Sequence, residues 1–112
     1  MAFKVRVGTR AQKRAGDVFV YIAHDLNSPR AAQRLFASYQ AALASLSTFP
    51  RNNALHLQLS AVLGTEIRKR RLGNYLLLFF IDDNAQAVYV FSLIHGRQTD
   101  LMPAVQDFDE LD

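Results

Sequence analysis

Hydrophobic and basic side chains alternate over residues 3–8, Phe-Lys-Val-Arg-Val-Gly. A period of two predicts a half-buried β-strand. From Thr9 onward the apolar residues recur at steps of three and four, and Thr9 stands three positions before Gln12, as in a capping box. The apolar stripe consists of Ala11, Ala15, Val18, Phe19, Ile22 and Leu26. We therefore expect a helix that begins at Thr9 and ends near Leu26.

The segment from Asp25 to Pro29 ends this helix and begins a second one. Asn27 or Ser28 can serve as the N-cap, and Pro29 suits the first helical turn. The second apolar stripe ends near Phe49-Pro50 and consists of Ala32, Leu35, Tyr39, Ala42, Leu43 and Leu46. Because the connection is short, the two helices should form an antiparallel hairpin.

Three strands are predicted in the second half of the chain, after an irregular or short helical connector over residues 51–63. They are Glu66–Leu72, Tyr75–Ile81 and Ala87–Ile94, and the turns between them are Gly73-Asn74 and Asp82-Asp83-Asn84. Gly73-Asn74 is a two-residue hairpin signal. The order of strand, two helices and three-stranded antiparallel meander predicts a single α+β domain over residues 1–112, with one sheet.

The strand Tyr75–Ile81 is apolar on both of its faces. One face carries Tyr75, Leu77, Phe79 and Ile81, and the other carries Leu76, Leu78 and Phe80. A helix hairpin covers only one face of a sheet, so the second face needs another cover. Two covers are open: a partner protein, or the C-terminal segment, which can form a short helix. The apolar residues of that segment are Leu101, Met102, Val105, Phe108 and Leu111.

Composition excludes several classes of protein. The absence of cysteine removes disulfides, thiol catalysis and cysteine zinc sites. No window reaches 18 apolar residues, so we expect no membrane span, and the alternating N-terminus lacks the apolar stretch of a secretion signal. The three histidines are scattered and make a weak case for a metal. We therefore expect a soluble cytoplasmic protein.

Charge is distributed unevenly along the chain. Residues 1–71 hold twelve of the thirteen basic groups and only three acidic ones, which gives that part a net charge of +9. Residues 100–112 hold five acidic groups and no basic one. A basic body suggests an anionic partner, and the acidic tail is expected to fold over the basic surface and compete for it. The alternative is a solvated surface with a frayed acidic end.

Four consecutive cations, Arg68-Lys69-Arg70-Arg71, form the densest charged feature. In an extended strand Arg68 and Arg70 point to one side, and Lys69 and Arg71 to the other. Such a strand can hold phosphate oxygens by charge-assisted hydrogen bonds. The alternative is an edge strand whose charges discourage aggregation.

His95-Gly96-Arg97 ends the last long strand, beside the same end of the predicted sheet. A metal-free ribonuclease needs a base, an acid and cations that stabilise the phosphorane. The candidate catalytic residues for such chemistry are Lys69, Arg71, His95 and Arg97. The alternative is a structural His95 at the strand end and an ion pair between Arg97 and Asp100.

Five short motifs occur in a characteristic order along the chain. They are Arg10-Ala11-Gln12-Lys13, Tyr21-Ile22-Ala23, Ser28-Pro29-Arg30-Ala31-Ala32, Leu72-Gly73-Asn74-Tyr75-Leu76 and Ile94-His95-Gly96-Arg97. The ordered set resembles the RelE/ParE superfamily, the toxins of type II toxin–antitoxin modules, also called plasmid stabilisation proteins. The resemblance covers nearly the whole chain and implies the RelE/ParE toxin fold.

That superfamily divides by target. RelE-like members are ribosome-dependent messenger-RNA endonucleases, with an arginine after the hairpin tyrosine, a second arginine after the last strand and a tyrosine near the C-terminus. In this chain Leu76 occupies the first position, Arg97 matches the second, and no tyrosine follows Tyr89. The resemblance therefore favours the ParE-like branch, whose members bind DNA gyrase and are not enzymes. A messenger-RNA endoribonuclease and a non-toxic degenerate module are the alternatives.

The resemblance also implies partners and binding residues. A cognate antitoxin is expected to contact Leu76, Leu78 and Phe80. DNA gyrase, or in the alternative the ribosome and its messenger RNA, is expected to contact Arg68, Lys69, Arg70, Arg71, Tyr75, His95 and Arg97. No cofactor or metal is expected, and the expected assemblies are a homodimer or a heterotetramer with the antitoxin.

Overall fold

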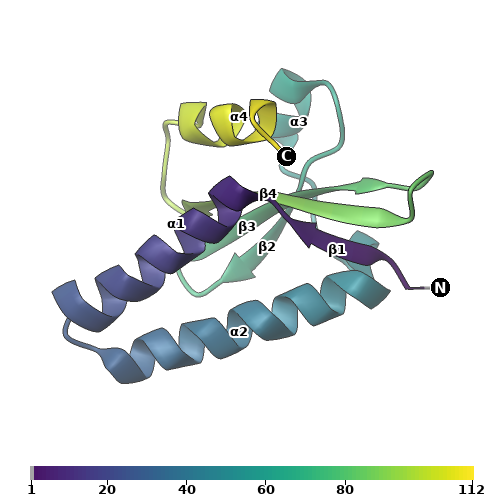
Figure 1. The fold of residues 1–112 in the computed structure, drawn as a ribbon. Helices are drawn as coiled ribbons and strands as arrows, with labels where there is room; N and C mark the ends of the chain where they lie inside the picture. The colour runs from purple at the N-terminus through teal and green to yellow at the C-terminus, as the bar shows by residue number, and fades with distance from the viewer. Residues whose placement is uncertain (1) are drawn as a thin grey trace.

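The computed structural model describes residues 2–112, which form one four-stranded sheet covered by helices on both faces (Figure 1). The strands are β1 (Lys4–Val7), β2 (Arg68–Leu72), β3 (Tyr75–Asp82) and β4 (Ala87–His95), in the spatial order β1-β4-β3-β2. Strands β2, β3 and β4 form the predicted antiparallel meander. Strand β1 pairs with β4 in parallel, so the first strand of the chain lies beside the last.

The predicted helix hairpin covers one face of the sheet. Its helices are α1 (Thr9–Val20), which continues as a π-helical turn (Tyr21–Asp25), and α2 (Pro29–Thr48). The fully buried side chains of this first core are Ala42, Leu46, Phe79, Val88 and Val90. Burying a valine, leucine or phenylalanine side chain of this core contributes roughly 2 kcal/mol to the free energy of folding.

The second face is covered by the chain itself. A 3₁₀ turn (Pro50–Asn52) leads into α3 (Leu57–Leu63), which confirms the short helical connector, and α4 (Met102–Asp109) follows the last strand. Together α3 and α4 enclose a second core whose fully buried members are Leu59, Ile67, Leu78, Phe91 and Ala104. Of the two covers predicted for this face, the C-terminal segment is the one observed, and α3 assists it.

The start of α1 differs from the prediction, whereas the start of α2 agrees with it. The N-cap of α1 is Gly8, with no side-chain capping bond, and the Thr9 hydroxyl donates instead to the Asp112 carboxylate. In a capping box the N-cap hydroxyl accepts from the backbone NH three residues later, but Thr9 is the first helical residue and the NH of Gln12 donates to the Gly8 carbonyl, so the predicted capping box is wrong. Ser28 is the N-cap of α2, also without a side-chain bond, and Pro29 is the first helical residue as expected.

The outer edge of β2 is only partly open. The backbone NH of Lys69 donates to the carbonyl of Ala54 at 2.9 Å, and Leu55 forms an isolated bridge with Arg68. The connector before α3 therefore covers the first half of this edge, and Arg70–Leu72 are left unpaired on that side. Within residues 2–112, no helix has both the length and the apolar character that crossing a bilayer requires.

Candidate functional site

The end of the sheet where β3 begins and β4 ends brings together Tyr75 and His95. These residues are direct partners in the antiparallel register, and their rings meet edge to face with centroids 5.3 Å apart. The Nδ1 of His95 accepts a hydrogen bond from the backbone NH of Arg97 at 3.2 Å. That contact places the ring proton of the neutral imidazole on Nε2. Two of the predicted target-binding side chains, the half-buried Tyr75 and the exposed His95, are therefore in direct contact.

Gly96 holds this end of the sheet together. Its backbone NH donates to the carbonyl of Asn74 at 2.7 Å, and a Cβ added to Gly96 would stand 3.1 Å from that same oxygen. Glycine thus permits a close approach between the end of β4 and the β2–β3 turn. The approach fixes the position of His95 and Arg97 relative to Tyr75.

The four cations of β2 separate onto two faces of the strand, as predicted. Arg68 and Arg70 lie on the α2 side, where Arg68 Nη1 donates to the Asn53 carbonyl at 2.7 Å and Arg70 Nη1 donates to Ser45 Oγ at 3.3 Å. The side chain of Arg68 is only 14% exposed. Arg68 therefore ties the connector to the sheet and presents little of its charge to a partner.

Lys69 and Arg71 lie on the opposite face, away from His95. Lys69 pairs with Leu78, three residues along β3 from Tyr75 and so about 10 Å along the sheet. Its neighbour is His56, whose pKa is lowered by burial and, to a lesser degree, by the charge of Lys69. The candidate ribonuclease residues Lys69, Arg71, His95 and Arg97 do not converge on one point.

The ion pair proposed between Arg97 and Asp100 is absent from the described residues 2–112. The side chain of Asp100 instead accepts from the backbone NH of Met102 at 3.0 Å, at the start of α4. Arg97 is exposed. Its guanidinium is therefore available to a partner at the end of the sheet.

Tyr75 separates two hollows in the surface. The smaller, of about 220 Å³, lies toward α1 and is bounded by Arg14, Asp17, His95 and Gln98. The larger, of about 400 Å³, lies toward α2; its polar lining is Arg34, Ser38, Asn74 and Tyr75, and its apolar lining includes Ile22 and Leu35. Burial, and secondarily the nearby Tyr21 hydroxyl, raises the pKa of Tyr75, so its hydroxyl is a neutral donor at pH 7.

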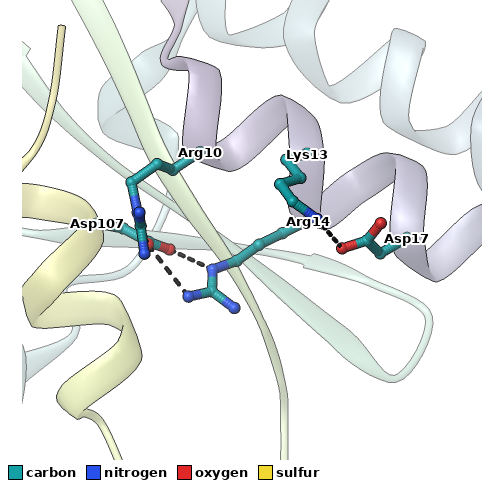
Figure 2. A pocket seen from close by; sticks show the side chains of 5 residues that line it. All are labelled: Arg10, Lys13, Arg14, Asp17 and Asp107. Atoms are coloured by element: carbon teal, nitrogen blue, oxygen red, sulfur yellow. Dashed lines mark hydrogen bonds and ion pairs between the residues drawn. The ribbon is translucent and has the colours of Figure 1, made fainter.

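The acidic C-terminal segment does not lie over the basic strand. Its central carboxylate, Asp107, is buried between α4, β4 and α1 (Figure 2). It accepts hydrogen bonds from Arg10 Nε at 2.7 Å, from Arg14 through Nε and Nη2, and from Ser92 Oγ at 2.7 Å. Glu110 also pairs with Arg10, at 3.2 Å. The predicted contact with residues 68–71 is therefore wrong: the nearest available cations are those of α1.

The electrostatics of Asp107 follow from these donors. Burial by itself would raise the pKa of this carboxyl, but the hydrogen bonds from Arg14, Arg10 and Ser92 outweigh burial and lower it. The hydrogen bond that Arg10 donates to Asp107 also raises the pKa of Arg10. Figure 2 shows Arg10 and Arg14 reaching from α1 toward Asp107, while Lys13 and Asp17 pair with each other beside them.

The three residues predicted to bind an antitoxin lie against α3 and α4. Leu78 is fully buried, whereas Leu76 and Phe80 are half-buried. The ring of Phe80 stacks on Tyr89 at 5.2 Å and meets Phe108 of α4 edge to face at 5.5 Å. A partner therefore has access to Leu76 and Phe80 in this conformation but not to Leu78.

Two features of this surface were not anticipated from the sequence. The sequence gives little sign of the Arg10–Arg14–Asp107 cluster, because Asp107 stands among the other acidic residues of the C-terminal segment. Its one signal is position: it lies three residues after Ala104 and four before Leu111, on the apolar side of α4. The hollow beside Arg34 depends on contact between α2 and the β2–β3 turn, for which no local pattern exists. Among residues 2–112, no three histidine, aspartate or glutamate side chains are grouped to hold a metal ion.

Comparison with known proteins is consistent with this fold. A family model described as the ParE toxin of the type II toxin–antitoxin system parDE matches residues 5–99, which include β2, β3, β4 and all of β1 except its first residue, but end before α4. The crystal structure of the toxin–antitoxin complex RelBE2 from Mycobacterium tuberculosis contains a chain of similar fold. It superposes with a TM-score of 0.56 at 23% identity, over 85% of this chain and 99% of that chain. No protein of curated function matches the sequence.

Proposed function

This chain belongs to the ParE family of toxins of type II toxin–antitoxin systems, and from that premise we propose that it binds and inhibits DNA gyrase. The observation that carries the choice of target is Leu76. It directly follows Tyr75 and is half-buried in the second core, so the position holds an apolar packing residue where the ribonuclease branch has a catalytic cation.

The arrangement of the remaining cations supports the same choice. Cleavage of an RNA strand without a metal requires a base, an acid and cations around one phosphate. His95 and Arg97 lie at the end of the sheet, but Lys69 lies beside His56 and both Lys69 and Arg71 are on the opposite face. The site is a binding surface built around Tyr75, His95 and Arg97.

We further propose that a cognate antitoxin neutralises the protein, and that the pair serves plasmid stabilisation. Within the expected hydrophobic contact, Leu76 and Phe80 offer accessible surface and Leu78 supports them from the core. Because gyrase acts on DNA inside the cell, we expect the protein to act in the cytoplasm.

Parallel assays on one preparation test this function. The purified protein is added to gyrase supercoiling and cleavage-complex reactions, and to a translation reaction in which ribosome-bound messenger RNA is followed by primer extension. We expect lost supercoiling and intact message. Message cuts that disappear in Arg97→Ala would instead establish the ribonuclease, and growth unaffected by induced expression would establish a non-toxic module.

A further inference from the structure

The hollow between α2 and the β2–β3 turn, here called the Arg34 hollow, contains polar groups without partners. The guanidinium of Arg34, the hydroxyls of Ser38 and Tyr75 and the side-chain amide of Asn74 line about 400 Å³ of open space. Within residues 2–112, none of these four side chains forms a hydrogen bond or an ion pair. Arg34, Ser38 and Asn74 are exposed and Tyr75 is half-buried, so these four polar groups, which line one hollow, are open to a polar ligand.

The charge of the Arg34 hollow selects an anion. No acidic side chain lines it, and Arg34 supplies its only formal charge. An arginine fork can hold both oxygens of a carboxylate, and a neutral tyrosine hydroxyl and an amide NH₂ can donate to the same group. The hollow is therefore complementary to a negatively charged group about the size of a carboxylate.

The hollow also has apolar lining, and this feature selects the source of the anion. Ile22 and Leu35 line it together with the polar groups, which suits the methylene stem of a glutamate or a neighbouring apolar residue. A nucleic-acid strand carries a charge at every nucleotide and calls for a row of cations along its path. A single arginine beside aliphatic side chains fits a protein segment better.

We propose that the Arg34 hollow binds an acidic side chain of the target protein, and that Arg34 determines specificity for that target. The inference rests on the proposed function, since Tyr75 joins the hollow to the surface of His95 and Arg97 where the target is expected to bind. It adds a residue on α2 to a surface otherwise built from the sheet.

Charge reversal at two neighbouring arginines tests the proposal. Arg34→Glu is compared with Arg30→Glu, because Arg30 is also an exposed arginine, one turn earlier on α2, and does not line the hollow. Both variants have the same net charge, and circular dichroism verifies their fold. We expect Arg34→Glu to raise the concentration for half-inhibition of gyrase at least tenfold, Arg30→Glu to change it less than twofold, and Arg34→Lys to retain part of the activity. Equal effects of the two reversals would overturn the proposal.

A second measurement keeps the inference separate from the choice of gyrase. Amide spectra of the ¹⁵N-labelled protein are titrated at low salt with an acetylated hexaglutamate peptide, and with a ten-nucleotide oligouridylate. We expect the peptide to shift the amides of Gly73 and Asn74, and Arg34→Glu but not Arg30→Glu to abolish these shifts. If the wild-type protein leaves gyrase unaffected, the proposed function fails while this titration still decides the inference.

Three results would overturn the inference. The first is the absence of peptide-induced shifts at Gly73 and Asn74. The second is stronger binding of the oligouridylate at the same amides, which would assign the hollow to RNA. The third is full toxicity of Arg34→Glu combined with loss of neutralisation by the antitoxin, which would assign the hollow to that partner instead.

Discussion

Among residues 2–112, Asp107 is the side chain with the most hydrogen bonds, although it stands in a segment whose composition is typical of a solvated tail. Removing a carboxylate from water costs several kcal/mol unless donors replace the lost hydration. Here two arginines and a serine hydroxyl supply those donors. The arginines retain partial exposure, with side chains 42% and 33% accessible, so only the carboxylate is fully withdrawn from solvent. The cluster fixes α4 against α1 and β4.

Replacing this carboxylate tests its contribution to stability. We expect Asp107→Asn to lower the free energy of unfolding by about 2 kcal/mol, because the amide keeps the shape but loses the charge that the two arginines require. Urea denaturation followed by circular dichroism measures the change. Asp109→Asn, an exposed acid on the same helix, is the matched control and should change stability by less than about 0.5 kcal/mol. Equal losses in both variants would contradict a specific role for Asp107.

The lowered pKa of Asp107 makes stability depend on pH in a defined direction. The folded pKa lies below the ordinary value of 3.8, so the unfolded chain binds the proton more readily and stability rises with pH in this range. The contribution is complete above about pH 5 and is lost as the pH falls through 3.8 toward the folded pKa.

Urea titrations of the wild type and of Asp107→Asn at intervals from pH 7 to pH 3 measure this contribution. The difference in stability between the two proteins should be constant at neutral pH and shrink on acidification. A difference that stays constant to pH 3 would show that the carboxyl titrates alike in the folded and unfolded chains.

At the scale of single elements, the junction of β4 with the β2–β3 turn depends on one close contact. A methyl group at Gly96 would meet the carbonyl oxygen of Asn74 at 3.1 Å, so the backbone there must give way by a few tenths of an ångström. We expect Gly96→Ala to lower stability by about 1 kcal/mol and to accelerate hydrogen exchange of the residue-96 amide.

A matched glycine in α1 should respond in the opposite way. A Cβ at Gly16 meets nothing within 4 Å, and this residue lies inside a regular helix. Gly16→Ala should therefore raise stability by roughly 0.5–1 kcal/mol, because alanine has the higher helix propensity. Thermal unfolding of both variants measures the two effects, and a stable Gly96→Ala would contradict the close contact at the sheet end.

The elements differ in how well the sequence predicts them, for physical reasons. Helices α1 and α2 have strong periodicity because each buries one stripe against the first core, and strands β3 and β4 are nearly continuous apolar runs because they contribute to both cores. The residues of β1 do not indicate which strand it pairs with, because Lys4–Val7 would alternate in the same way beside any strand. The parallel pairing of β1 with Ala87–Val90 depends on the course of the whole chain. The missing Thr9 cap has a similar origin, since its partner Asp112 is 103 residues away.

At the scale of the whole molecule, the acidic end packs on α1 and β4 and does not lie over the basic strand. Gly8 illustrates the closeness of the contact, because a Cβ there would stand 2.7 Å from Leu111 Cδ1. Phe108 packs edge to face on Phe91, and Asp107 is bound to α1. The family match ends at residue 99, so this closing element lies beyond the matched region.

Deletion of residues 107–112 should therefore weaken the protein. We expect a lower urea midpoint and increased binding of the dye ANS, because the deletion uncovers the second core around Phe91. The full-length double variant Asp109→Asn, Glu110→Gln is the control, since it removes acidic charge without shortening the apolar cover. A deletion protein as stable as the wild type, with stronger binding of anions, would restore the regulatory interpretation of the tail.

The parallel pairing of β1 with β4 has a consequence for synthesis on the ribosome. Lys4 pairs with Ala87, so 83 further residues must be synthesised after Lys4 before its pairing partner is present. At about 5–20 residues per second that interval lasts roughly 4 to 17 s. Throughout this time the nascent chain lacks a complete sheet, and Tyr75 lacks its partner His95. A chain that ends before residue 95 therefore lacks the contact between Tyr75 and His95, on which the proposed target surface depends.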